Sequence, residues 1–101
     1  MDKVLRTLRS LGLPFAYDHF AEGEAPEPPF ICYLSPGSDN FFADNSVFVP
    51  VGRYRIELYT DHKDPTTEAK VEKALASFGW EKTEVYIDTE RLYQIVYEIE
   101  V

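Results

Sequence analysis

The chain has 101 residues, of which 45% are hydrophobic and 28% are charged. This is the size and composition of one globular domain, so we expect residues 1–101 to form a single domain and exclude a disordered chain. Ten Lys and Arg against 18 Asp and Glu give a formal net charge of −8. This charge opposes binding to phosphate backbones and to anionic lipid surfaces, so we expect neither specific nucleic-acid binding nor membrane binding.

The sequence also indicates a cellular compartment. No stretch approaches the roughly 20 apolar residues of a membrane span. The first residues, MDKVLRTLRSLGLP, are too charged for the core of a signal peptide. The single cysteine excludes a disulfide within the chain. Together these features favour a reducing cytoplasm.

Residues 2–11 are predicted to form a helix that docks on the core. Their apolar residues recur at helical spacing, and these are Val4, Leu5, Leu8 and Leu11. Gly12 and Pro14 end this helix. Residues 15–29 contain three prolines and one glycine and are predicted to be irregular. Residues 30–35 form an apolar run bounded by prolines, which predicts a strand buried on both faces.

Turn-forming residues dominate the next segment. Residues 36–40, PGSDN, have the composition of a turn. Residues 41–52 are predicted to form a long loop with a short strand at 46–49. In residues 53–60, apolar side chains alternate with charged and polar ones, which predicts a strand with one face in the core.

A second helix and a closing hairpin are predicted in the last third of the chain. The helix begins at Asp64 and Pro65, since aspartate is a good N-cap and proline fits the first helical position. Gly79 ends it, and its buried face carries Val71, Ala74, Leu75 and Phe78. Residues 80–88 and 92–101 form the hairpin. Its inward residues are predicted to be Thr83, Val85, Ile87, Tyr93, Ile95, Tyr97, Ile99 and Val101.

This order of elements predicts an α+β fold. An N-terminal helix precedes a β-β-α-β-β arrangement, in which two hairpin-like strand pairs flank the second helix. We expect a mostly antiparallel sheet of about four strands, with the helices packed on one face.

The reactive residue types show no pattern typical of a catalytic or metal site. Cys32 lies in a predicted buried strand with no cation nearby in sequence, so we interpret it as a packed thiol. His19 and His62 do not form a zinc pattern. The spacing of a calcium-binding loop is not matched by Asp39, Asp44, Asn45, Asp61 and Asp64. Carboxylates are plentiful, but no spacing selects a catalytic pair, so we expect no enzyme activity, metal or cofactor.

Four stretches of the chain carry a resemblance to a known class of protein. They are ADN at 43–45, IELYT-x-x-K-D-P at 56–65, x-E-x-x-V-E-x-x-L at 67–75 and TERLYQIVYE at 89–98. On these stretches, residues 30–101 resemble small prophage proteins of Gram-positive bacteria, the tail-terminator, tail-completion or head–tail joining proteins of long-tailed phages. The resemblance implies a protomer of a homo-oligomeric ring, with other phage tail or neck proteins as partners. It implies no cofactor and no catalysis, and a location in the host cytoplasm during assembly and then in the virion.

A ring protomer needs extra apolar surface, and the segment around residues 41–48 is the predicted interface. Its residues are Phe41, Phe42, Ala43, Asp44, Asn45, Val47 and Phe48. The alternative is a small ferredoxin-like binding or dimerisation module, which would form a two-fold dimer rather than a closed head-to-tail ring. A third possibility is an acidic protein that mimics DNA. It would need an array of negative charge on one face, for which the candidates are Glu98 and Glu100 with either Glu81 or Glu84.

Overall fold

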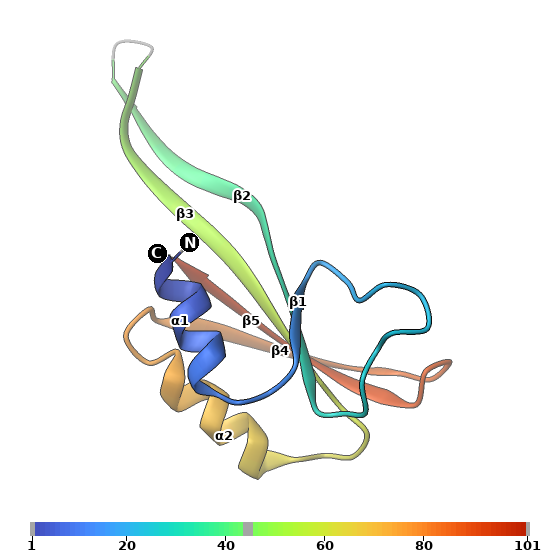
Figure 1. Cartoon of the computed structure of the whole chain (residues 1–101). Coiled ribbons are helices and arrows are strands. Elements are labelled where there is room, and N and C mark those ends of the chain that lie inside the picture. Colours follow the sequence, from blue (N-terminus) through green and yellow to red (C-terminus); the bar gives the residue numbers. More distant parts are fainter. Residues whose placement is uncertain (1, 44–45, 101) are drawn as a thin grey trace.

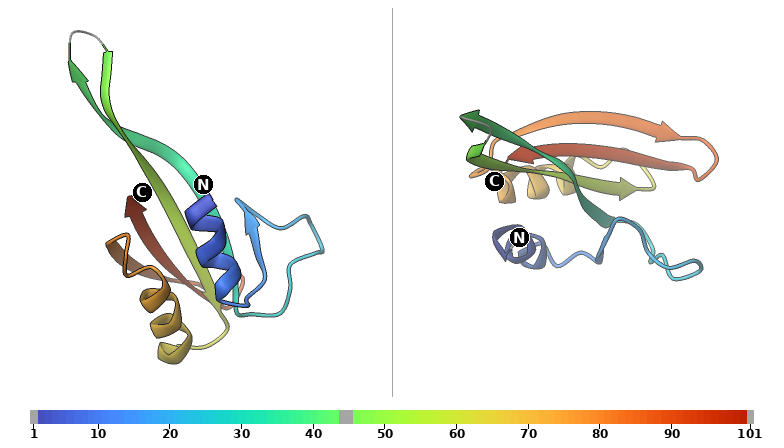
Figure 2. Two further views of the ribbon diagram at one scale, coloured as in Figure 1. Left: turned by 60° about the vertical axis from the view of Figure 1, so that its left-hand side comes forward. Right: turned by 90° about the horizontal axis from the view of Figure 1, so that it is seen from above.

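The computed structural model describes residues 2–43 and 46–100, which form an α+β fold as predicted. In chain order the elements are α1 (Asp2–Ser10), β1 (Phe15–Tyr17), β2 (Phe30–Ala43), β3 (Ser46–Thr60), α2 (Pro65–Ala74), β4 (Trp80–Ile87) and β5 (Leu92–Glu100) (Figure 1). The strands form one sheet in the order β1-β2-β3-β5-β4. Both helices lie on the same face of this sheet (Figure 2).

The sheet has five strands, whereas the sequence predicts about four. The additional strand is β1, which pairs with β2 in parallel, while the other neighbouring strands are antiparallel. The N–H of Asp18 extends this pairing by donating to the carbonyl of Tyr33 at 2.7 Å. A strand of three residues is too short for a periodic pattern to appear in the sequence, which explains why this segment is predicted to be irregular.

β2 and β3 form one long hairpin, which corrects the predicted turn and loop between residues 36 and 52. The two strands stay paired as far as Ala43 and Ser46. A shift in register falls at Pro36, and Pro50 lies in a part of β3 that has only one neighbouring strand. Proline is tolerated at bulges and on edge strands, where its missing N–H removes no ladder hydrogen bond. Proline therefore does not end either strand here.

The core lies between the helices and the facing side of the sheet. Its buried residues form one cluster of Val4, Leu8, Ile31, Tyr33, Ile56, Leu58, Val71, Leu75, Ile95, Tyr97 and Ile99. Tyr54 and Phe78 pack against this cluster and are partly buried. The predicted inward faces of both helices, of β3 and of β5 are thus confirmed. Val101, also predicted to face inward, lies outside the described residues.

Both helices begin as predicted and end earlier than predicted. α1 ends at Ser10, and α2 ends at Ala74, well before Gly79. The Asp64 side chain caps α2 by accepting a hydrogen bond from the N–H of Thr67 at 3.1 Å. In the described part of the chain, neither helix has the length and apolar character needed to cross a bilayer.

The side chains of β4 face the opposite sides of the sheet from those predicted. The residues predicted to face inward lie on the outer face of the sheet, and they are Thr83, Val85 and Ile87. Lys82 and Glu84 instead share the helix-facing side with their cross-strand neighbours Tyr97 and Ile95. β4 is an edge strand, and inward-pointing charges on such a strand discourage pairing with another chain. Both residues remain exposed, and their charges are paired, Lys82 with Glu68 and Glu72 of α2 and Glu84 with Lys63, which precedes α2.

Candidate functional site

The outer half of the β2–β3 hairpin projects from the rest of the sheet as a two-stranded ribbon (Figure 1). We call residues 38–43 and 46–52 the ribbon. β5 pairs with β3 only between Arg53 and Thr60, and β1 pairs with β2 only as far as Tyr33. Among the described residues, no third strand therefore pairs with the ribbon. The projection contributes to an elongated molecule of 49 × 28 × 23 Å.

The ribbon contains the predicted interface residues. Three of them lie in β2 and two in β3, namely Phe41, Phe42 and Ala43, and Val47 and Phe48. In the register of the hairpin, Phe42 pairs with Val47 and Ala43 pairs with Ser46. Asp44 and Asn45 lie outside the described residues. The fold thus brings the two halves of the predicted interface together at the far end of the hairpin.

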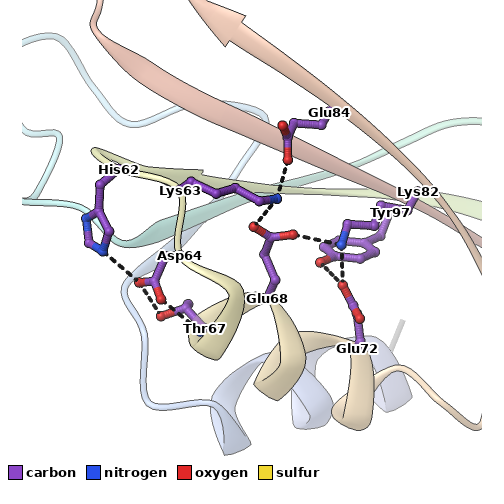
Figure 3. Close-up of polar contacts among 9 residues, drawn as sticks. All are labelled: His62, Lys63, Asp64, Thr67, Glu68, Glu72, Lys82, Glu84 and Tyr97. Atoms are coloured by element: carbon purple, nitrogen blue, oxygen red, sulfur yellow. Dashed lines mark hydrogen bonds and ion pairs between the residues drawn. The ribbon is translucent and has the colours of Figure 1, made fainter.

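A cluster of charged side chains joins α2 to β4 on the helix-facing side of the sheet (Figure 3). The carboxylate of Glu68, whose side chain is 3% exposed, lies 2.7 Å from the ammonium nitrogens of both Lys63 and Lys82. Lys82 also donates to Glu72 at 2.7 Å, and the same oxygen of Glu72 accepts from the Tyr97 hydroxyl at 2.8 Å. We call the whole cluster the clamp, and its members are Lys63, Glu68, Glu72, Lys82, Glu84 and Tyr97.

Four groups of the clamp have pKa values that are shifted away from neutrality. Burial alone would raise the pKa of Glu68, but hydrogen bonds from Lys63 and Lys82 outweigh burial and hold this pKa below its ordinary value. Hydrogen bonds to Glu68 raise the pKa of both lysines, and burial raises the pKa of Tyr97. General acid–base catalysis needs a group that titrates near the operating pH, and all four shifts lead away from neutrality. The geometry therefore suits the attachment of β4 to α2.

The outer face of the sheet carries a buried thiol beside a row of hydrogen-bonded side chains. Burial, together with the negative charges of Glu57 and Asp18, raises the pKa of Cys32 to about 11. The Tyr59 hydroxyl donates to Glu57 at 3.0 Å and accepts from the Gln94 amide at 2.9 Å. Cys32 therefore stays protonated at neutral pH, which agrees with its interpretation as a packed thiol.

An open groove lies at the end of the sheet away from the ribbon, and it has a volume of about 540 Å³. It is bordered by the segment that links β1 to β2 and by the turn between β4 and β5. Its more buried lining residues include Phe30, Tyr59 and Leu92. The exposed residues at its rim include Asp18, Glu27, Asp61, Glu90 and Arg91. Since carboxylates outnumber cations at this rim, we call the whole groove the acidic groove.

Four of the loop residues considered as metal ligands make contacts within the chain, and they are His19, Asp61, His62 and Asp64. Asp64 caps α2, and Nδ1 of His62 lies 2.6 Å from a carboxylate oxygen of Asp61. Nδ1 of His19 lies 2.9 Å from a carboxylate oxygen of Asp18. Within the ranges that the structure describes, no three His, Cys, Asp or Glu side chains converge as they would around a metal ion.

The acidic residues considered as a DNA-mimicking face are divided between the two sides of the sheet. Glu81, Glu98 and Glu100 lie on the outer face, whereas Glu84 faces the helices and pairs with Lys63. In the neighbouring strand, Arg55 lies beside Glu98 and Arg53 lies beside Glu100. These residues therefore do not form an uninterrupted negative face.

The clamp and the acidic groove are not visible in the sequence as motifs, because their residues come from distant segments. The one local signal for the clamp is the helical i, i+4 spacing of Glu68 and Glu72, together with the alternation of Lys82 and Glu84 in β4. The acidic groove has no comparable signal, since it depends on how a loop and a turn meet across the sheet. No model of a known protein family matches the chain, and no curated protein matches it significantly.

Proposed function

We propose that this protein is a structural subunit in the assembly of a long-tailed phage or prophage, acting at the tail end or the head–tail junction as a member of a homo-oligomeric ring. The observation that carries the proposal is the ribbon, a paired element that projects from the sheet and has a largely apolar sequence. The resemblance of residues 30–101 to small tail-assembly proteins supports the phage context. On this proposal the protein acts in the host cytoplasm during assembly and then remains in the virion.

The energetics of an isolated ribbon favour a contact with a partner. A two-stranded hairpin alone is at best marginally stable in water, and three or more strands or a packing surface are needed for stability. The ribbon sequence includes Phe41, Phe42, Val47 and Phe48. Full burial of such a side chain is worth about 1.5–3 kcal/mol. A neighbouring subunit that covers the ribbon would therefore stabilise both the ribbon and the assembly.

The position of the ribbon favours a ring over a two-fold dimer. It lies at one end of an elongated molecule, and on this proposal a different part of the neighbouring chain receives it. Such heterologous contacts generate closed rings when the rotation closes. The net charge of −8 also suits a ring through which DNA passes, because a negative surface does not hold the phosphate backbone.

The proposal is tested by removing the ribbon without disturbing the sheet. Residues 38–52 are replaced by Asn-Gly, a pair that forms two-residue hairpin turns and would join the paired residues Gly37 and Arg53. The masses of the wild type and the shortened chain are measured at several concentrations by light scattering, and particles are viewed by electron microscopy. A matched control is Val85→Ser, which changes an exposed valine outside the ribbon.

We expect the wild type and Val85→Ser to form rings and the shortened chain to remain a folded monomer with an unchanged thermal midpoint. A wild type that stays monomeric at all concentrations would overturn the proposal. A two-fold dimer that survives removal of the ribbon would favour the ferredoxin-like dimerisation module instead.

A further inference from the structure

The acidic groove combines an aromatic floor with an excess of negative charge. Phe30 is buried and stacks on the partly buried Tyr59 with ring centroids 5.1 Å apart, and both side chains line the groove. Phe20 packs edge-on against Phe30 from the loop side, at 5.4 Å between centroids. A surface of this kind favours cationic side chains with long alkyl stems, because the stems cover apolar area and the charged ends lie over aromatic rings.

The rim of the groove supplies charge for such a ligand. It carries four carboxylates, those of Asp18, Glu27, Asp61 and Glu90, against the single guanidinium of Arg91. His19 and His62 lie beside Asp18 and Asp61, respectively. Among the described residues, Glu27 and Glu90 have no ion-pair partner and are exposed. These two carboxylates are therefore available to a cation from outside the chain.

The same chain carries a complementary surface on α1. Three of its ten Lys and Arg residues occur in the first nine positions, while no Lys or Arg occurs between Arg9 and Arg53. Lys3 and Arg9 are exposed on α1, whose opposite side packs into the core through Val4 and Leu8. α1 packs on the helix-facing side of the sheet, whereas Cys32 and Tyr59, which line the groove, lie on the outer face. The exposed face of α1 and the floor of the groove therefore belong to opposite faces of the sheet.

We propose that the acidic groove binds the exposed face of α1 from a second copy of this chain. The contact is head-to-tail, with Lys3 and Arg9 of one protomer against Glu27 and Glu90 of the next. Complementary charge in such contacts steers association and selects the partner surface. The ribbon is a poorer occupant, because residues 36–52 contain two aspartates and no Lys or Arg. This inference rests on the proposed ring function and assigns a second contact between its neighbouring subunits.

The test is a charge exchange between the two surfaces. One variant carries Lys3→Glu and Arg9→Glu, and a second carries Glu27→Lys and Glu90→Lys. A matched control carries Glu22→Lys and Glu24→Lys, which make the same charge change. Both residues are exposed in the segment that also carries Glu27, and neither lines the groove. Circular dichroism checks that each variant is folded, and assembly is measured by light scattering at increasing concentration.

We expect each exchanged variant alone to need about tenfold more protein to assemble, or to fail. An equimolar mixture of the two should assemble like the wild type, because the acidic α1 of one then meets the basic groove of the other. The control should assemble like the wild type. If the wild type assembles and the exchanged variants do so equally well, or if the mixture is not rescued, this inference is wrong and the ribbon proposal stands. A wild type that never assembles overturns both.

Discussion

Lys82 of β4 places its ammonium nitrogen 2.7 Å from a carboxylate oxygen of Glu68, which is buried on α2. This ion pair ties the free edge strand of the sheet to the helix beneath it. It also explains how an edge strand can carry charges on its core-facing side, since each charge there finds a partner. Because inward charges discourage further strand pairing, β4 is a poor place for another chain to extend the sheet. The open backbone of the ribbon is the better place.

Removal of one member of this pair should destabilise the fold. Lys82→Met leaves the Glu68 carboxylate buried with only Lys63 as a cationic partner, and we expect the free energy of unfolding to fall by about 1–3 kcal/mol. Urea unfolding followed by circular dichroism measures the change. Lys73→Met, at an exposed position of α2, serves as the control and should stay within about 0.5 kcal/mol of the wild type. Equal stability of all three proteins would contradict the role of the clamp.

The same carboxylate should make stability depend on pH in the acid range. The pKa of Glu68 is lower in the folded protein than its ordinary value of 4.5, so its stabilising effect is fully present above that value and is lost as the pH falls through the folded pKa. The difference in unfolding free energy between the wild type and Glu68→Gln should therefore be constant from pH 6 to 8 and shrink below about pH 4.5. Urea titrations at each pH measure it. If the difference grew on acidification, the pKa of Glu68 would be raised in the folded protein and not lowered.

Cys32 should react slowly with thiol reagents in the native state. Its pKa is raised from 9.0 to about 11, so at pH 8 the thiolate fraction is about 100-fold smaller than for an ordinary thiol. Alkylation by iodoacetamide, followed by mass spectrometry, should accelerate at least about 100-fold when the protein is unfolded in urea. Equal rates in the native and unfolded protein would show that the thiol is accessible and ionisable.

The packing of α2 on the sheet should depend strongly on Leu75, the C-cap residue of α2, which is fully buried in the core cluster. Leu75→Ala removes buried methyl groups and leaves a cavity, and we expect a loss of about 2–5 kcal/mol in unfolding stability. Ala76→Ser, at the next and exposed position, is the matched control. A thermal or urea midpoint for Leu75→Ala that coincides with the control would show that this part of the chain does not carry the core.

Elements that depend on local chemistry can be predicted from this sequence. The start of α2 follows from Asp64 and Pro65, whose capping and backbone preferences act within one turn. The inward face of β5 follows from the strict alternation of apolar and polar residues around Ile95 and Tyr97. A strand that buries only one of its faces has this alternation. In both cases the local signal and the tertiary environment agree.

The ribbon and the inward face of β4 could not be predicted in the same way. Pro36 and Pro50 are strong turn signals, and they are compatible with a long hairpin because Pro36 falls at a register shift and Pro50 lies where β3 has only one neighbouring strand. In β4, the apolar side chain of Val85 points outward, while Lys82 points inward. That choice depends on Glu68, which is distant in sequence. The acidic groove likewise exists only after the fold has formed.

The ribbon itself makes the most direct prediction about assembly. Phe41→Ser together with Phe42→Ser should abolish ring formation, because these residues lie where no strand other than β3 pairs with β2. On the proposed function a partner covers these two rings, so the thermal midpoint of the monomer should shift by less than about 4 °C. Tyr86→Ser removes an exposed aromatic ring from β4 and is the control that should still assemble. Light scattering measures assembly, and differential scanning calorimetry measures the midpoint. If the double variant instead unfolds the monomer, both rings belong to the folded core, and the assembly contact must be sought at the acidic groove and α1.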